Sequence, residues 1–190
     1  MNENIRTFIA AELPEKIKQE INNYIISLKK TAPEVKWVKA RGIHITIKFL
    51  GEISLQLCEQ VKGDLSGISD IAKPFKITIN DSGAFPNKHR PRVIWLGLEQ
   101  DAENSLVKLH KWVDNKLSPL GFEKEKRKYS PHLTIGRVKK PEQLNKLFQY
   151  LDETPLPVST FDVNEIVLMQ SELKSTGAVY APIRKYDFVY

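Results

Sequence analysis

The sequence of 190 residues has a single cysteine, Cys58, and only four histidines. One cysteine cannot form a disulfide within the chain, and its place on the apolar side of an expected helix predicts a buried, unreactive thiol. No apolar run approaches the roughly 20 residues of a membrane-spanning helix. Residues 1–16 lack the basic and apolar segments of a signal peptide. We therefore expect a cytoplasmic protein with no membrane association.

Several enzyme motifs are also missing. The chain has no Cys-x-x-Cys or His-Glu-x-x-His zinc pattern, no phosphate-binding P-loop and no glycine pattern of a dinucleotide-binding fold. Two histidines alone are too few to hold zinc, so a metal site is the weaker interpretation of any histidine pair here. We expect no cofactor.

The charge is unbalanced toward the basic side, with a net charge of +6 and a pI near 9.3. Such a chain suits a polyanionic partner such as nucleic acid. Two local basic clusters, NKHRPR (87–92) and KEKRK (124–128), are each equally consistent with a solvated loop. His89 lies in the first cluster and is more typical of an exposed bystander, whereas His110 lies on the apolar side of a helix and should be packed.

One tetrapeptide pattern occurs twice. HITI begins at His44 and HLTI begins at His132, so two of the four histidines share the pattern His-x-Thr-Ile. The order of expected elements repeats around them, as strand, helix, strand, helix, strand. We therefore expect one α+β domain over residues 1–190, bilobal, with two pseudo-symmetric β-α-β-α-β units and largely antiparallel sheets flanking a central cleft. The units cover roughly 1–85 and 90–172, and a strand at 178–190 closes the chain.

The expected elements follow from alternation and helical spacing. The strands are expected at 4–13, 36–53, 74–85, 91–100, 126–138, 159–173 and 178–190, and the helices at 14–28, 54–68, 101–118 and 141–151.

Side chains alternate between the two faces of a strand. His44, Thr46 and Lys48 would therefore share one face, and His132 and Thr134 would share the corresponding face of the second unit. Arg137 has the opposite parity, so it reaches the same face only if Gly136 allows a β-bulge. A pseudo-twofold axis would bring both pairs to one cleft.

Two imidazoles suit displacement at phosphorus. Histidine has a free pKa of about 6.5, so one ring can be neutral and accept a proton while the other is charged and donates one. The hydroxyls of Thr46 and Thr134 would contact phosphate oxygens, and the ammonium of Lys48 would offset their charge. A purely structural role is the ordinary role of a single strand histidine, but the matched pair favours catalysis.

Both motifs, HITIKFLGEI and HLTIGRVKK, resemble those of the 2H phosphoesterase superfamily. The segments RTFIAAELP, RVIWLGL and LMQSELKSTGAVY are similar to its RNA 2′,3′-cyclic phosphodiesterase branch, also called the 2′-5′ RNA ligase family. The resemblance implies a monomer that hydrolyses a 2′,3′-cyclic phosphate at an RNA end to a 2′-phosphate without metal. It also implies His44 as proton donor, His132 as proton acceptor and Arg137 as a motif residue at the phosphate.

Two other functions stay open at this point. The chain could act as a 2′-5′ RNA ligase or 2′-5′ phosphodiesterase, or use the same chemistry on another substrate, such as a 2′-5′ linked oligonucleotide or a cyclic ADP-ribose phosphate. It could also be a binding module that holds an RNA end or nucleotide with little turnover. The intact His-x-Thr pairs favour an enzyme.

Overall fold

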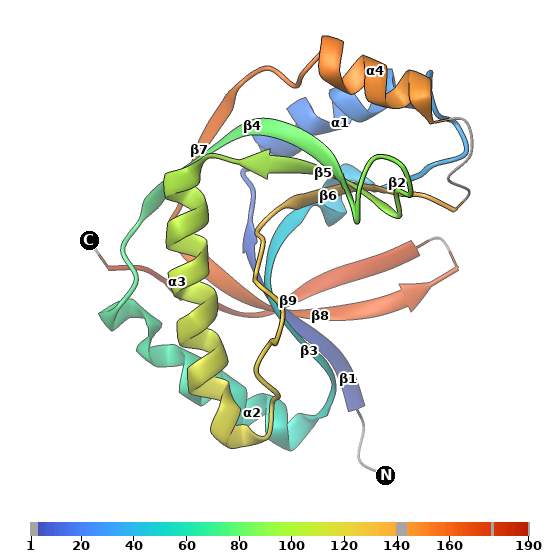
Figure 1. Ribbon diagram of the computed structural model, residues 1–190. Helices are drawn as coiled ribbons and strands as arrows, with labels where there is room; N and C mark the ends of the chain where they lie inside the picture. The colour runs from blue at the N-terminus through green and yellow to red at the C-terminus, as the bar shows by residue number, and fades with distance from the viewer. Residues whose placement is uncertain (1–3, 140–143, 176, 190) are drawn as a thin grey trace.

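The computed structural model describes residues 4–139, 144–175 and 177–189. Within these residues, nine strands form a single curled sheet, every observed pairing is antiparallel, and four α-helices pack on it (Figure 1). The strand order is β7-β4-β5-β6-β3-β1-β8-β9, with β2 paired to β6. The expected α+β class is therefore confirmed.

The strands are β1 (Asn4–Glu12), β2 (Lys36–Trp37), β3 (His44–Ser54), β4 (Phe75–Phe85), β5 (Val93–Leu98), β6 (Leu133–Arg137), β7 (Ser159–Val163), β8 (Glu165–Lys174) and β9 (Gly177–Asp187). The helices are α1 (Glu15–Lys29), α2 (Leu55–Asp64), α3 (Gln100–Leu117) and α4 (Asn145–Glu153), and 3-10 turns cover Ala40–Gly42, Leu65–Asp70 and Ser118–Leu120.

The two halves of the sheet draw on both sequence units. β3 contains the first motif, and β6 begins at Leu133, directly after His132 of the second motif; the two strands are neighbours at the centre. On the β3 side lie β1, β8 and β9, and on the β6 side lie β5, β4 and β7. The third strand of the first predicted unit, β4, thus pairs with β5 of the second. The helices follow this exchange, with α2 and α3 beside the β3 half and α1 and α4 beside the β6 half (Figure 1).

The prediction of a single strand at 159–173 is wrong. The segment forms two strands, β7 and β8, which lie in different halves of the sheet. Phe161 and Val163 are buried at odd positions, whereas Ile166 and Leu168 are buried in the same large core at even positions. This change of phase around Asn164 marks a chain that leaves one strand and enters another.

Three other boundaries differ from expectation. The segment 36–53 is interrupted by the 3-10 turn that ends at Gly42, and the strand expected over 126–138 begins only at Leu133. The helix expected over 54–68 becomes 3-10 after Asp64. The expected helix start at Pro141 lies outside the described residues, and α4 is observed from Asn145.

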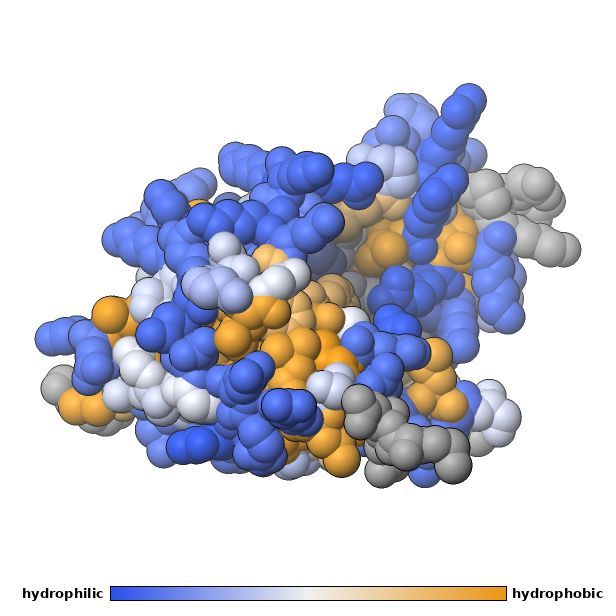
Figure 2. All heavy atoms as spheres, turned by 90° about the horizontal axis from the view of Figure 1, so that it is seen from below, coloured by the Kyte–Doolittle hydropathy of each residue, from blue (hydrophilic) through white to orange (hydrophobic). Residues whose placement is uncertain are grey.

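The two faces of the sheet have different packing. Ile9 and Ala11 of β1 belong to the large core with the helices, whereas Phe8 and Ala10 belong to a small cluster on the opposite face. We call this opposite face the inner face. In the part of the chain that the structure describes, no helix is long and apolar enough to span a membrane. Hydrophilic side chains cover much of the surface, and an apolar area lies among them on the side seen in Figure 2.

Candidate active site

The register between β3 and β6 brings the two His-x-Thr motifs together. Ile45 pairs with Leu133 in antiparallel fashion. In that register His44 stands across from Thr134, and Thr46 stands across from His132, all with side chains on the inner face. Directly opposite residues are about 5 Å apart and diagonal ones about 7–8 Å. The four side chains therefore surround a space in which the imidazoles occupy opposite corners.

Each imidazole is oriented by a backbone carbonyl two residues before it. Nδ1 of His44 lies 3.0 Å from the carbonyl oxygen of Gly42, and Nδ1 of His132 lies 2.8 Å from that of Ser130. A carbonyl only accepts a hydrogen bond, so each Nδ1 carries the proton. The neutral rings therefore have Nε2 unprotonated, which leaves that atom to accept a proton or, once charged, to donate one.

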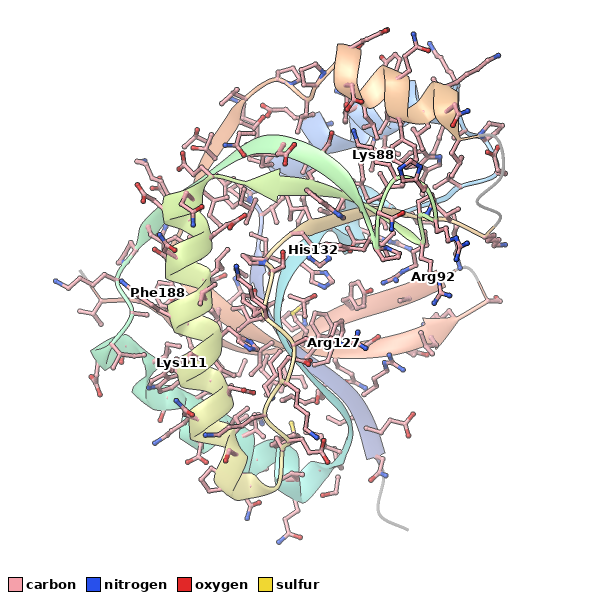
Figure 3. The ribbon with its side chains drawn as sticks, in the orientation of Figure 1. Lys88, Arg92, Lys111, Arg127, His132 and Phe188 are labelled. Carbon is pink, nitrogen blue, oxygen red and sulfur yellow. The ribbon has the colours of Figure 1, made fainter. Side chains whose placement is uncertain are left out.

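Aromatic rings pack around both histidines. The ring centroid of His44 lies 4.7 Å from Phe8 and 5.1 Å from Tyr180, and the latter contact is edge-to-face. His132 and Phe85 pack edge-to-face, with their ring centroids 4.9 Å apart. Figure 3 shows His132 in the middle of the molecule, with Arg92 to its right and Arg127 below it in that view.

Burial makes both imidazolium forms unfavourable. Desolvation lowers the pKa of His44 to about 4, with smaller contributions of both signs from the Gly42 carbonyl, Glu12, Lys18 and Arg137. Desolvation also lowers the pKa of His132, opposed by the Ser130 carbonyl and assisted by Arg137. Both rings are therefore neutral near pH 7 in the free protein.

Each motif has a β-bulge at its isoleucine, the last of its four residues. In β3, Thr46 pairs with Ala10 but Lys48 pairs with Ile9, so Ile47 is the extra residue. The bulge turns Lys48 to the helix side, where it is 7% exposed. Its ammonium donates to the Asp114 carboxylate and to the Glu123 carbonyl oxygen. The expectation that Lys48 contacts a phosphate on the inner face is therefore wrong, because alternation fails at the bulge.

The equivalent bulge in β6 turns Arg137 to the inner face. Trp95 pairs with Thr134 and Val93 pairs with Arg137, which leaves Ile135 as the extra residue. Trp95 and Val93 share one face of β5, so their partners Thr134 and Arg137 also share one face. The charge of Arg137 lowers the pKa of both catalytic candidates, in agreement with a position near each. The sequence predicted that Arg137 could reach the face of the histidines only through a β-bulge, and this bulge is present.

The sequence reasoning missed a clamp that holds the first bulge. Tyr129 Oη donates to the Thr46 carbonyl oxygen at 2.7 Å, and Nδ1 of His110 lies 2.8 Å from that of Ile47. The two rings stack at 4.2 Å. Tyr129 lies three residues before His132, so the clamp ties the two motifs together. His110 is packed, as predicted, but its bond to the β3 backbone depends on a register that no local pattern reveals.

The indole ring of Trp95 packs closely against Gly83. A Cβ atom at Gly83 would stand 2.5 Å from the indole, which neighbours Phe85 with centroids 5.2 Å apart. Within the described residues the indole nitrogen is buried without a hydrogen-bond partner. Its position is therefore set by packing of its ring, and through Phe85 this packing supports His132.

The remaining candidates lie away from these residues. Cys58 is buried, as predicted, and burial raises the pKa of its thiol. His89 is exposed in the basic loop. Among the residues that the structure describes, no group of three or more His, Cys, Asp or Glu side chains is placed to hold a metal ion.

The fold and the paired motifs define a two-histidine phosphoesterase-like architecture, and comparison places the chain in one family. Residues 13–174 match the 2′-5′ RNA ligase superfamily. The chain is 38% identical over 184 residues to the RNA 2′,3′-cyclic phosphodiesterase of Methanocaldococcus jannaschii, covering 96% of this chain and 100% of that protein. It is 35% identical over 193 residues to the protein of the same name in Thermotoga maritima, at 97% and 96% coverage. The chain therefore belongs to the 2′-5′ RNA ligase superfamily.

Solved structures show the same fold. E. coli LigT complexed with 3′-AMP superposes with a TM-score of 0.80 at 23% identity, covering 99% of this chain and 100% of that one. A protein of Thermus thermophilus, TT0787, gives a TM-score of 0.75 at 24% identity, with 97% and 98% coverage. At these identities the likeness extends to the fold alone.

Proposed function

We propose that this protein is an RNA 2′,3′-cyclic phosphodiesterase that opens a terminal cyclic phosphate to a 2′-phosphate without a metal ion. The observation that carries the proposal is the register Ile45 to Leu133, which sets two imidazoles and two threonine hydroxyls around one space. The names of the relatives support the substrate class.

The proposed reaction uses one proton transfer at each imidazole. Nε2 of His132 takes a proton from water as its oxygen bonds to phosphorus. The bond from phosphorus to the 3′ oxygen breaks, and His44 gives that oxygen a proton from Nε2. The hydroxyls of Thr46 and Thr134, with Arg137, hold the non-bridging oxygens. Each positioned proton transfer typically contributes about 10²–10⁴ in rate.

His44 must gain a proton before it can act as the acid. Burial holds its pKa near 4, which favours the neutral ring in the free protein. A bound phosphate anion favours the charged ring, because an opposite charge within about 4–6 Å raises the pKa of an imidazole. The low pKa of His44 alone would favour the reverse assignment of roles, so the assignment rests on family resemblance and requires a direct test.

The test replaces the bridging 3′ oxygen with sulfur. A thiolate leaves without protonation, since a free thiol has a pKa of about 8.5. His44→Ala should recover much of its lost rate on this substrate, whereas His132→Ala should not, because its water remains unactivated. Rescue of His132→Ala alone would reverse the roles, and rescue of neither would point to a binding site without proton transfer.

The RNA chain itself would lie along basic loops. The segments 87–92 and 124–128 are exposed almost throughout, and they carry the charge that suits a phosphate backbone. Affinity for an RNA that ends in a cyclic phosphate should therefore fall as salt rises, more steeply than affinity for the corresponding mononucleotide. We also propose that the protein acts as a monomer, which sedimentation at working concentration checks.

The family name favours a second activity, the joining of RNA through a 2′-5′ bond. In that reaction the 5′ hydroxyl of a second RNA replaces water and gives its proton to His132. Incubation of a cyclic-phosphate-ended RNA with a 5′-hydroxyl RNA separates the two activities. A product of summed length indicates ligation, and a 2′-phosphate product of unchanged length indicates hydrolysis.

A further inference from the structure

Phe49 is a large apolar side chain that stands 64% exposed near the proposed active site. It pairs with Phe8 across β1 and β3, while Thr46 pairs with Ala10. Phe8 and Ala10 share one face of β1, so Phe49 and Thr46 both lie on the inner face. The bulge at Ile47 is what places Phe49 there.

Phe49 and Arg137 occupy equivalent positions in the two motifs. Each is the third residue after the motif threonine, and each is turned to the inner face by a bulge at the motif isoleucine. One side of the site therefore carries a guanidinium and the other a phenyl ring. A cyclic phosphate explains a cation but not an exposed phenyl, so the phenyl side calls for an apolar part of the ligand.

Aromatic rings connect Phe49 to His44. Phe49 lies 5.9 Å from Phe8, which is 1% exposed and in turn lies 4.7 Å from His44 and 5.1 Å from Tyr180, between ring centroids. Only two ring-to-ring contacts separate Phe49 from the imidazole. We call Phe8, Phe49 and Tyr180 the aromatic platform. Phe8 is the buried ring of the platform, and Phe49 is its most exposed ring.

We propose that the aromatic platform binds the nucleobase of the nucleotide that carries the cyclic phosphate, with the base stacked on Phe49. The proposal rests on the proposed function, in which His44 protonates the departing 3′ oxygen. That oxygen belongs to the terminal ribose, so the ribose and its base lie on the His44 side of the phosphorus. A nucleobase offers a flat π-face, and stacking on an aromatic side chain accepts any of the four bases. The basic net charge of +6 suits the phosphate to which this base is attached.

The decisive experiment removes the ring from the protein and the base from the substrate. Adenosine 2′,3′-cyclic phosphate is compared with 1-O-methylribose 2′,3′-cyclic phosphate, which has the same ribose and phosphate without a base. Phe49→Ala should raise KM for the adenosine substrate about 5- to 20-fold, at the lower end of base–aromatic stacking. It should leave kcat near the wild-type value and leave KM for the base-free substrate unchanged. Phe49→Trp should retain the wild-type KM.

Leu173 provides a matched control. It lies in β8 with the parity of Met169, on the same inner face, and is 71% exposed. Leu173→Ala should leave both substrates unaffected, because Leu173 has no part in the ring contacts that connect Phe49 through Phe8 to His44.

Equal losses on both substrates would overturn the proposal and make Phe49 a support for the site. No loss on either would mean that the base does not contact Phe49. A loss seen only with a dinucleotide would move the contact to the preceding base, and a change in sedimentation of Phe49→Ala would assign the ring to a protein interface. If the wild type hydrolyses neither substrate, the proposed function fails. Calorimetric binding of adenosine 2′-phosphate against ribose 2′-phosphate then still tests the platform.

Discussion

Replacing Lys48 with methionine should lower stability strongly while sparing phosphate binding. Lys48 and Asp114 form a buried ion pair whose side chains are 7% and 10% exposed. Asp114 is desolvated, yet the hydrogen bond and charge of Lys48 hold its carboxyl pKa below the ordinary value. Removing Lys48 leaves a carboxylate buried without its partner, which typically costs about 3–5 kcal/mol. For a chain of this size that corresponds to a fall in Tm of about 6–20 °C.

Calorimetry and urea unfolding of Lys48→Met measure this cost. Lys76→Met is the control, since Lys76 pairs with Asp162 at 69% and 52% exposure and should lose only about 0–1 kcal/mol. The double variant Lys48→Met with Asp114→Leu should recover part of the loss, because no unpaired charge remains. A stable Lys48→Met protein whose kcat/KM falls 100-fold or more would refute the reasoning and return Lys48 to the phosphate.

Three further expectations concern the proposed active site. The pH profile of kcat/KM should be bell-shaped with its maximum below pH 6.5, because burial lowers the pKa of both His44 and His132; a falling limb centred above pH 7 would contradict this. Arg137→Gln should raise both imidazole pKa values in an NMR titration, since a nearby positive charge is removed, and should raise KM; unchanged titration curves would place Arg137 away from the site. Gly83→Ala should destabilise the fold by about 1–3 kcal/mol by displacing Trp95, as urea unfolding would show, and an undisturbed fluorescence spectrum of Trp95 would argue against that packing.

The local sequence pattern was sufficient to predict the two motifs and most of the helices and strands. Alternation around His44 and His132 and the repeated order of elements predicted an antiparallel α+β fold with two matched strands, and β3 and β6 are neighbours. The exchange of β4 and β8 between the halves was not predictable in this way. A strand pattern specifies which face is buried but not which partner strand will bury it.

The bulges account for the errors within the site. Strict alternation predicted Lys48 on the inner face and Arg137 on the helix side. In the structure Lys48 lies on the helix side and Arg137 on the inner face. A bulge adds one residue to one strand, so every side chain beyond it changes face. Gly136 hinted at one bulge, because glycine tolerates the backbone conformations that a bulge can require. No local signal marked the bulge at Ile47, which is held by contacts from α3 and from Tyr129.

The duplicated motif produces two histidines that are matched in geometry and unequal in surroundings. Both rings donate from Nδ1 to a carbonyl two residues before them, and both precede a bulge. Beyond the bulge the units differ, because one presents Phe49 and the other Arg137 on the same face. The more apolar side also contains His44, whose charged form is disfavoured by burial in the free protein. In the mechanism that we propose, His44 is the proton donor, and the negative phosphate would raise the pKa of its imidazole and so prepare the acid that releases the 3′ oxygen.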